Sequence, residues 1–216
     1  MRHGGRVLVE CLAQLGARHG FGVPGESYLS VLDALHDTPG APEFTLCRNE
    51  GGAGFMAAAY GKLTGSPGLC FVTRGPGATN ASIGVHTAMQ DSAPMILFVG
   101  QIATGMRDRE VFQEVDYRAF FGPIAKWATE ITHVDRIPEI VSRAWTTALS
   151  GRPGPVVVAL PEDVISAATD TPAISGPAEL PVPHASAASL SAVREALSQA
   201  ERPLILVGGG GWTDEG

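Results

Sequence analysis

Hydrophobic side chains along the chain follow two patterns, which predict helices in regular exchange with short strands. In one group of segments apolar residues recur at i, i+3, i+4 and i+7, which is typical of amphipathic helices. This group predicts helices over 5–19, 28–36, 50–65, 78–89 and 137–148. Short apolar runs predict strands over 69–73, 95–100 and 156–160, and two further short strands are predicted over 20–25 with its turn and over 43–47. The stretch between 101 and 136 carries neither pattern.

The strands predicted over 69–73, 95–100 and 156–160 are almost continuously apolar instead of alternating between apolar and polar positions. Strands of this kind are buried on both faces, as in a parallel sheet covered by helices. Repeated strand–helix units also require right-handed crossovers. We therefore predict an α/β domain over residues 1–165, with a doubly wound, mostly parallel sheet and helices on both faces.

The composition changes after residue 165. Residues 166–187 contain four prolines and only two charged residues, which is typical of an extended linker. Beyond it the spacing of Leu190, Val193 and Leu197 predicts a helix, and 203–207 reads as a strand that ends in the glycines 208–211. One helix and one strand cannot bury a core, so we expect 188–216 to be the truncated start of a central domain.

Charge and cysteine usage exclude several classes of protein. The chain has 15 Lys and Arg against 22 Asp and Glu, a net charge of −7, and its scattered basic residues argue against nucleic-acid binding. Its longest apolar runs fall far short of the ~20 residues that cross a membrane, and we recognise no signal peptide. Cys11, Cys47 and Cys70 form no CxxC pair and the six histidines are dispersed. We expect free thiols, no metal site in this chain and a cytoplasmic location.

Three turns that follow predicted strands carry the residues of greatest chemical interest, because ligands of open α/β sheets bind at the carboxyl ends of strands. The turns are Val23-Pro24-Gly25-Glu26, Arg48-Asn49-Glu50-Gly51-Gly52 and Thr73-Arg74-Gly75-Pro76-Gly77-Ala78-Thr79-Asn80.

Glu50 stands between a strand and a helix that opens with the small residues 51–54. Asn49 as N-cap and Glu50 in the first turn would stabilise the helix start. That alone does not account for the glycines, each of which costs about 1 kcal/mol relative to alanine but lets a backbone or a flat ligand come close. Two interpretations stay open: a capped helix start, or an enclosed functional carboxylate.

The Gly75-Pro76-Gly77 turn has the position of a phosphate cradle at a helix N-terminus. It matches neither GxGxxG nor the P-loop pattern. A tight turn in which Asn80 makes local hydrogen bonds is the slightly favoured alternative.

Six motifs occur in one order along the chain, and their order is specific. They are Phe21-Gly22-Val23-Pro24-Gly25, Arg48-Asn49-Glu50, Gly75-Pro76-Gly77-Ala78-Thr79-Asn80, Asp91-Ser92-Ala93-Pro94, Phe112-Gln113-Glu114 and Gly151-Arg152-Pro153-Gly154-Pro155. This set resembles the N-terminal, pyrimidine-binding domain of the thiamine diphosphate enzymes of the acetolactate synthase and pyruvate oxidase group. The resemblance covers about residues 4–164, and residues 203–208 also resemble the start of that family's central domain.

The resemblance implies a cofactor and a catalytic role for Glu50. In the family, the glutamate at this position hydrogen-bonds N1′ of the aminopyrimidine and favours the imino tautomer, whose exocyclic nitrogen removes the proton from thiazolium C2. The cofactor then attacks a 2-keto acid, while the protein supplies placement and proton relay. The interpretation of Glu50 as an enclosed carboxylate fits this role.

The resemblance also implies further cofactor contacts. The turn at 75–80 should line the pyrimidine pocket instead of holding phosphate, because the family binds the diphosphate and its Mg²⁺ on a C-terminal domain with a GDG…N motif. FAD, where the family binds it, mainly contacts the central domain, so it is an expectation for the full-length protein only. The residues that would contact the cofactor with Glu50 are Val23, Pro24, Thr73, Pro76, Asn80 and Gln113, the last close to the reacting centre.

Two departures from the family leave details open. Asn49 stands where acetolactate synthases commonly have His, so an imidazole beside the cofactor is missing and the exact reaction is undecided. Glu26-Ser27-Tyr28 replaces the usual small residues. Tyr28 would either narrow the substrate pocket or, as the favoured alternative, pack locally at the start of a helix.

Active sites of the family lie between subunits, which implies a homodimer or homotetramer. The small-residue face of the helix over 50–65 is a candidate for the dimer contact, although an ordinary core helix would use the same residues, Gly54, Ala57, Ala58 and Gly61.

The sequence therefore predicts the N-terminal cofactor-binding domain of a thiamine diphosphate-dependent lyase or transferase, either an acetolactate synthase-like carboligase or a 2-keto acid decarboxylase, inactive as this fragment. One alternative is the pyrimidine subunit of a split two-chain decarboxylase, which the linker and the unfinished second domain disfavour. The other is a non-catalytic nucleotide-binding α/β module, which the missing GxGxxG and P-loop patterns and the setting of Glu50 disfavour.

Overall fold

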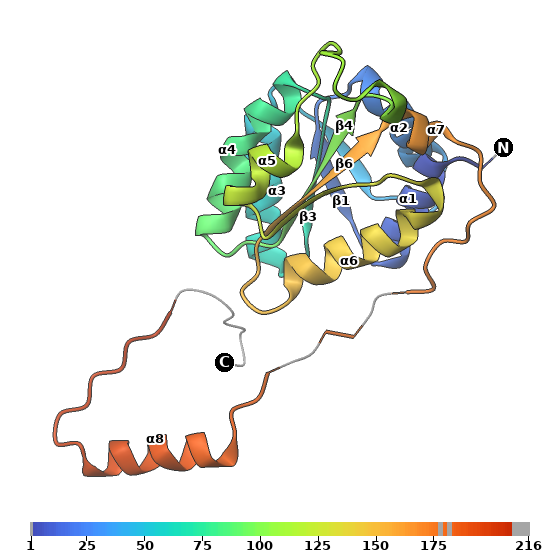
Figure 1. Cartoon of the computed structure of the whole chain (residues 1–216). Helices are drawn as coiled ribbons and strands as arrows, with labels where there is room; N and C mark the ends of the chain where they lie inside the picture. The colour runs from blue at the N-terminus through green and yellow to red at the C-terminus, as the bar shows by residue number, and fades with distance from the viewer. Residues whose placement is uncertain (1, 177–178, 181–182, 209–216) are drawn as a thin grey trace. The chain divides into compact units, whose positions relative to one another are not determined.

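Six parallel strands form a single sheet in the computed structural model, which describes residues 2–176, 179–180 and 183–208 (Figure 1). The strand order is β2-β1-β3-β4-β6-β5, and every neighbouring pair is parallel. The strands are β1 (His19–Gly22), β2 (Glu43–Leu46), β3 (Gly68–Val72), β4 (Met95–Gln101), β5 (Trp127–Glu130) and β6 (Pro155–Pro161). The doubly wound α/β fold is thereby confirmed.

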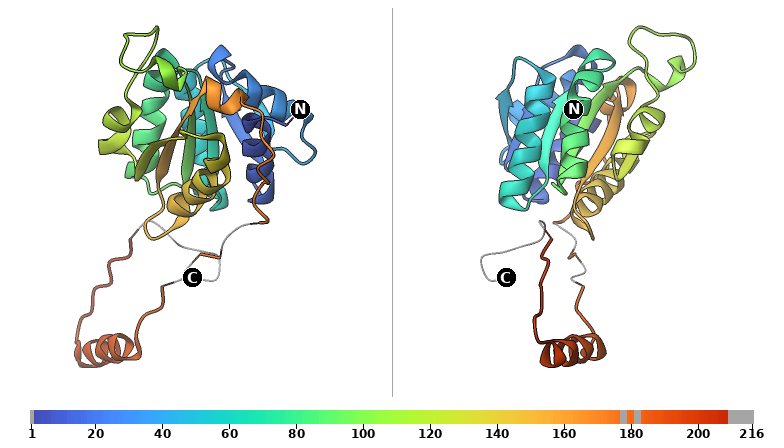
Figure 2. Two further views of the ribbon diagram at one scale, coloured as in Figure 1. Left: turned by 45° about the vertical axis from the view of Figure 1, so that its right-hand side comes forward. Right: turned by 90° about the vertical axis from the view of Figure 1, so that its left-hand side faces the viewer.

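Helices cover both faces of this sheet. They are α1 (Gly4–Gln14), α2 (Leu29–Asp37), α3 (Glu50–Thr64), α4 (Pro76–Gln90), α5 (Tyr117–Phe121), α6 (Ile137–Leu149) and α7 (Glu162–Ser166), with short 3₁₀ turns η1 (Glu26–Tyr28), η2 (Thr104–Met106), η3 (Gly122–Ile124) and η4 (Val134–Arg136). One hydrophobic core lies under α1, α2, α6 and α7, and a second lies under α3, α4 and α5. Figure 2 shows the two layers on opposite sides of the sheet.

The central strands supply both cores by the alternation of their side chains. In β3, Leu69 and Phe71 point into the first core, whereas Cys70 and Val72 point into the second. All four are fully buried, which stabilises the fold by roughly 1.5–3 kcal/mol for each large side chain. This double burial is the reason that the strand is apolar at every position.

Several elements differ from the prediction, including α5 and α7, which were not predicted. Helix α1 ends at Gln14 instead of continuing to residue 19, because Gly16 adopts φ +82° and breaks the helix. Strand β5 was not predicted: it is a four-residue strand that pairs with β6 at the edge of the described sheet and is mostly half-buried. Its sequence therefore lacks the continuous apolar run that marks the central strands.

The three cysteines are buried free thiols, as predicted. Burial raises the pKa of the Cys70 thiol well above its ordinary value. Within the described residues, no helix is both long and apolar enough to span a membrane.

The chain divides into two units, residues 1–179 and 180–216. In the first unit, part of the predicted linker contacts the α/β fold: Ala168 forms an isolated bridge with His3, and Thr169 N donates to the Arg2 carbonyl. Ala173 and Ile174 pack against the first core. Positions 177, 178, 181 and 182 of that linker lie outside the described residues.

The second unit contains helix α8 (Ala187–Gln199), which confirms the helix predicted there. Residues 203–207 form no strand, so this prediction was wrong. A strand needs a neighbour for its backbone hydrogen bonds, and the described residues of this unit offer none. The side chains of 204–207 are 60–89% exposed. The glycines at 209–211 lie outside the described residues.

Helices α3 and α4 approach each other to backbone contact. A Cβ on Gly84 would lie 2.5 Å from the carbonyl carbon of Gly54. The small-residue face of α3 (Gly54, Ala57, Ala58 and Gly61) is buried inside the chain against α4, β3 and the residues before β4. The core-helix alternative is therefore right, and a dimer contact through this face is wrong.

We predict that Gly84→Ala destabilises the fold by about 1–3 kcal/mol, because the added methyl group must push two backbones apart. Gly52→Ala is the matched control, since a Cβ there meets no heavy atom within 4 Å, and it should raise stability by up to about 1 kcal/mol. Urea unfolding of both variants measures the difference. Equal stability of the two variants would contradict the backbone contact.

Candidate functional site

The predicted site residues all follow the carboxyl ends of four neighbouring strands. The order β2-β1-β3-β4 places Glu50 after β2, Val23 and Pro24 after β1, and the turn that begins with Thr73 after β3. Gln113 lies in the long connection after β4. Because all strands run in parallel, these segments share one edge of the sheet.

Glu50 is the first residue of α3. Asn49 is the N-cap, and its Oδ1 accepts a hydrogen bond from Gly52 N at 3.2 Å, so the predicted capped helix start is confirmed. The carboxylate sits where the partial positive charge of a helix N-terminus favours an anion. It is only half-buried, so this chain by itself does not enclose it.

Asn80, on the second turn of α4, donates from Nδ2 to Oε2 of Glu50 at 3.0 Å. A Cβ on Gly77 would lie 3.7 Å from Oε1 of Glu50 and 3.0 Å from Cγ2 of Thr73. The first turn of α4 therefore passes between Glu50 and Thr73 without a side chain of its own at Gly77. Asn80 bonds a residue 30 positions away instead of making only local hydrogen bonds.

Tyr28 supports the turn at Val23-Pro24-Gly25 from within the first core. The Tyr28 ring is 1% exposed, and its hydroxyl donates to the Val23 carbonyl at 2.5 Å. Burial raises the pKa of this phenol well above its ordinary value, so the group stays a neutral donor. Tyr28 packs inside the first core, so the local-packing alternative is right and Tyr28 does not narrow a substrate pocket.

Thr73 joins the β1 and β3 turns. Its Oγ1 lies 2.8 Å from Oγ of the buried Ser27, and a Cβ on Gly25 would lie 2.5 Å from Thr73 Cβ. Val23 N also donates to the Phe71 carbonyl at 3.3 Å. The two turns are thus packed together with little room for adjustment.

Arg74 ties three strand ends together, a role that its sequence position did not indicate. Its guanidinium bonds Glu26 after β1 and Glu162 after β6, each at 3.1 Å, while its side chain is 11% exposed. Its backbone N donates to Ser27 Oγ at 3.3 Å. The mostly buried guanidinium charge is thereby compensated by two carboxylates.

Gly75 adopts φ +60° and ψ −109° as N-cap of α4, a conformation suited to glycine. Its N–H donates to the hydroxyl of Tyr117 at 2.8 Å in a buried contact. The Gly75 N–H group is therefore already hydrogen-bonded, and the next residue, Pro76, has no backbone N–H group. This disfavours the phosphate-cradle interpretation, because such a cradle uses free backbone N–H groups.

Gln113 packs directly on this turn. A Cβ on Gly75 would lie 2.7 Å from the Gln113 Cβ. Gln113 has φ +66°, and Asp108 and Glu110 in the same connection also have positive φ. Such values are uncommon for residues other than glycine, so the conformation of this connection is imposed by its surroundings.

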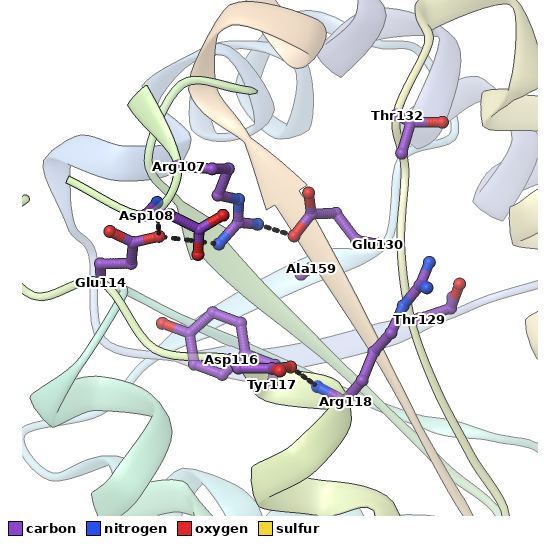
Figure 3. A pocket seen from close by; sticks show the side chains of 10 residues that line it. All are labelled: Arg107, Asp108, Glu114, Asp116, Tyr117, Arg118, Thr129, Glu130, Thr132 and Ala159. Atoms are coloured by element: carbon purple, nitrogen blue, oxygen red, sulfur yellow. Dashed lines mark hydrogen bonds and ion pairs between the residues drawn. The ribbon is translucent and has the colours of Figure 1, made fainter. Parts of the chain in front are cut away.

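A cavity of about 300 Å³ lies beside this connection (Figure 3). Its walls carry the ion pairs of Arg107 with Glu114 and Glu130. None of the predicted cofactor contacts is among its lining residues, which are Arg107, Asp108, Glu114, Asp116, Tyr117, Arg118, Thr129, Glu130, Thr132 and Ala159. Within the part of the chain that the structure describes, no group of three or more His, Cys, Asp or Glu side chains could hold a metal.

Two of the six motifs lie at the opposite edge of the sheet. Arg152 donates to Ser92 Oγ at 2.8 Å and to the carbonyls of Met89 and Gln90 at the end of α4. Lys126 Nζ similarly donates to the Thr147 and Ser150 carbonyls at the end of α6. Each cation binds carbonyls at a helix end. The contacts of Arg152 with Ser92 and of both cations with the helix ends therefore stabilise the fold, at the edge of the sheet away from Glu50.

The sequence matches a known protein family. The family model described as "Thiamine pyrophosphate enzyme, N-terminal TPP binding domain" matches residues 2–120. An acetolactate synthase of Bacillus subtilis is 37% identical over 205 residues, which cover 95% of this chain and 36% of that protein.

The acetolactate synthase isozyme 3 large subunit of Escherichia coli is 36% identical over 218 residues, which cover 99% of this chain and 38% of that protein. A mitochondrial acetolactate synthase catalytic subunit of Aspergillus candidus is 36% identical and is covered to 31%. The chain thus spans about a third of the length of the curated relatives it matches.

We predict that Arg152→Ala lowers the free energy of unfolding by about 1 kcal/mol, since the last carbonyls of α4 lose a cationic partner. Cofactor affinity of the full-length protein should stay unchanged, because the contact lies at the edge of the sheet away from Glu50. Thermal unfolding and calorimetry with thiamine diphosphate measure the two quantities. A loss of affinity without a loss of stability would contradict the structural role.

Proposed function

The chain belongs to the thiamine pyrophosphate enzymes, and we propose that the edge around Glu50 holds the aminopyrimidine ring of the cofactor, with Glu50 as its catalytic carboxylate. The observation that carries the proposal is the pair of Glu50 and Asn80. Oε2 of Glu50 accepts from Asn80, which leaves Oε1 as the acceptor for a ring nitrogen.

The residues around this pair fit a flat heterocycle. Gly25 and Gly77 let both turns pack closely on Thr73, since a Cβ on either would lie within 3.0 Å of a Thr73 side-chain atom, and Pro24 and Pro76 are exposed on the same edge. Val23 and Thr73 would complete the wall, and Gln113 would approach from the connection after β4.

The chemistry divides between the cofactor and the chain. Thiamine diphosphate supplies a carbanion at its thiazolium ring, which amino-acid side chains cannot provide. Glu50 would hold or share a proton at the ring nitrogen, Asn80 would orient the Glu50 carboxylate, and the two turns would fix the ring in place. Asn49 is exposed beside Glu50 and carries no titratable group, so any proton relay next to the ring would have to come from elsewhere.

For the full-length protein we propose a carboligase of acetolactate synthase type or a decarboxylase, with a 2-keto acid as substrate. The relatives that support this are themselves named acetolactate synthases. Mg²⁺ and the diphosphate would be held by a C-terminal domain, and FAD, where present, by a central domain. The site would then be completed only by further protein.

In a homodimer or homotetramer, a second subunit would supply the protein surface that completes the site. Glu50 is half-buried and Asn80 exposed at the edge of this chain, although a catalytic carboxylate of this kind works best when shielded from water. Helices α3 and α4 also expose Phe55, Met56 and Ile83 by 43–54%, which supplies apolar surface for an obligate contact.

We predict that Glu50→Gln in the full-length protein slows the exchange of the cofactor's C2 proton for deuterium by 10²-fold or more, within the usual range of roughly 10²–10⁴ for general acid–base catalysis. The assay uses thiamine diphosphate and Mg²⁺ in deuterium oxide and requires no substrate. Glu43→Gln, on β2 but with an exposed side chain, is the control and should exchange at the normal rate. Unimpaired exchange in Glu50→Gln would contradict the proposal.

We also predict that residues 1–216 alone bind thiamine diphosphate with a dissociation constant well above the micromolar range, because the diphosphate would find no anchor in this chain. Titration calorimetry in the presence of Mg²⁺ measures this. Micromolar binding by the isolated chain would contradict the proposal that the diphosphate is held by another domain.

A further inference from the structure

We propose that Tyr117 is a positioning residue of this site, whose buried hydroxyl fixes the Gly75–Pro76 turn and, through it, the backbone of Gln113. The proposal rests on the function proposed above, since it concerns the placement of two predicted cofactor contacts. Tyr117 lies outside the six motifs, and the proposal gives it no part as a reacting group.

Tyr117 lies at the start of α5 and is 3% exposed. Its ring packs at a tilt against Phe121, with centroids 6.2 Å apart, inside the second core. The ring is therefore held by packing, and the position of its hydroxyl follows from the position of the ring. Burial also raises the pKa of this phenol, so it remains neutral at physiological pH.

The hydroxyl is the hydrogen-bond partner of a backbone group that would otherwise be unsatisfied. Gly75 is buried, and its N–H donates to Tyr117 Oη at 2.8 Å. An N–H group buried without a partner costs more than a hydrogen bond contributes. Removal of the hydroxyl therefore favours a rearranged turn, in which the Gly75 amide turns to water.

Such a rearrangement cannot leave Gln113 in place. The Gln113 Cβ and carbonyl oxygen lie 2.7 Å and 3.1 Å from the position of a Cβ on Gly75, so the two backbones are in direct contact. Both residues also have positive φ, and Gln113 keeps this uncommon conformation only while its surroundings enforce it.

The rest of the connection is braced independently of Tyr117. Arg107 pairs with Glu130 and Glu114, and Glu114 Oε1 accepts from Asp108 N at 3.1 Å (Figure 3). The buried Gln101 donates to the Val115 carbonyl at 2.9 Å. With these contacts intact, loss of the Tyr117 hydroxyl loosens one point, the junction of Gly75 with Gln113, and not the whole connection.

The test is Tyr117→Phe in the full-length protein, which keeps the ring and removes one oxygen atom. Tyr60→Phe is the matched control: its ring contacts His19 and Phe21, and no described residue hydrogen-bonds its hydroxyl. We expect Tyr117→Phe to slow C2-proton exchange of bound thiamine diphosphate about tenfold at saturating cofactor, within the effect of a sub-ångström to ångström misplacement. Tyr60→Phe should exchange at the wild-type rate.

A second readout separates positioning from stability. The melting temperatures of both variants are measured first, both are assayed below them, and hydrogen exchange of the Gly75 amide is measured without cofactor. Faster amide exchange together with slower C2 exchange in Tyr117→Phe supports the proposal. A lower melting temperature with unchanged C2 exchange would overturn it and leave Tyr117 a core residue.

Failure of the inference and failure of the proposed function give different results. If Glu50→Gln abolishes C2 exchange while Tyr117→Phe does not change it, the proposed function stands and the positioning role is wrong. If the wild-type protein does not accelerate C2 exchange at all, the proposed function is wrong, and the positioning role falls with it.

Discussion

The contact of α3 with α4 through Gly54 and Gly84 is the constraint on which the candidate site depends. Each helix begins at the carboxyl edge of the sheet, one with Glu50 and the other with the turn that leads to Asn80. Their side chains meet at 3.0 Å because the helix axes can come close, with backbone against backbone. A larger residue at either glycine would separate the helices and with them the carboxylate from its amide partner.

The two hydrophobic cores support the site from opposite faces of the sheet. From the first core Tyr28 bonds the Val23 carbonyl, and from the second Tyr117 bonds the Gly75 amide. Between them, Ser27, Thr73 and Arg74 link the turns laterally. Exposed turns are ordinarily mobile parts of a fold, whereas here buried hydroxyls hydrogen-bond them to the two hydrophobic cores.

The features that depend on a local sequence pattern could be predicted. The continuous apolar run of β3 and the N-cap of Asn49 were predictable, because burial on both faces and helix capping leave direct marks on neighbouring residues. Strand β5 was missed because its sequence, Trp-Ala-Thr-Glu, carries no continuous apolar run. The roles of Tyr117 and Arg74 could not be predicted, since their partners lie 42 and 88 positions away and a buried tyrosine or a paired arginine has no sequence signature of its own. The small-residue face of α3 fitted two structures equally well, and only the position of Gly84 decided between them.

The caps made by Arg152 and Lys126 have a consequence for how such a protein can diversify. Both lie at the amino edge of the sheet and hold the ends of α4 and α6, while every predicted contact with a ligand lies at the carboxyl edge. The residues that cap these helices and the residues predicted to contact a ligand are therefore separate sets, at opposite ends of the strands. A substitution in a turn at the carboxyl edge can therefore alter contacts with a ligand while the helix caps at the amino edge stay intact.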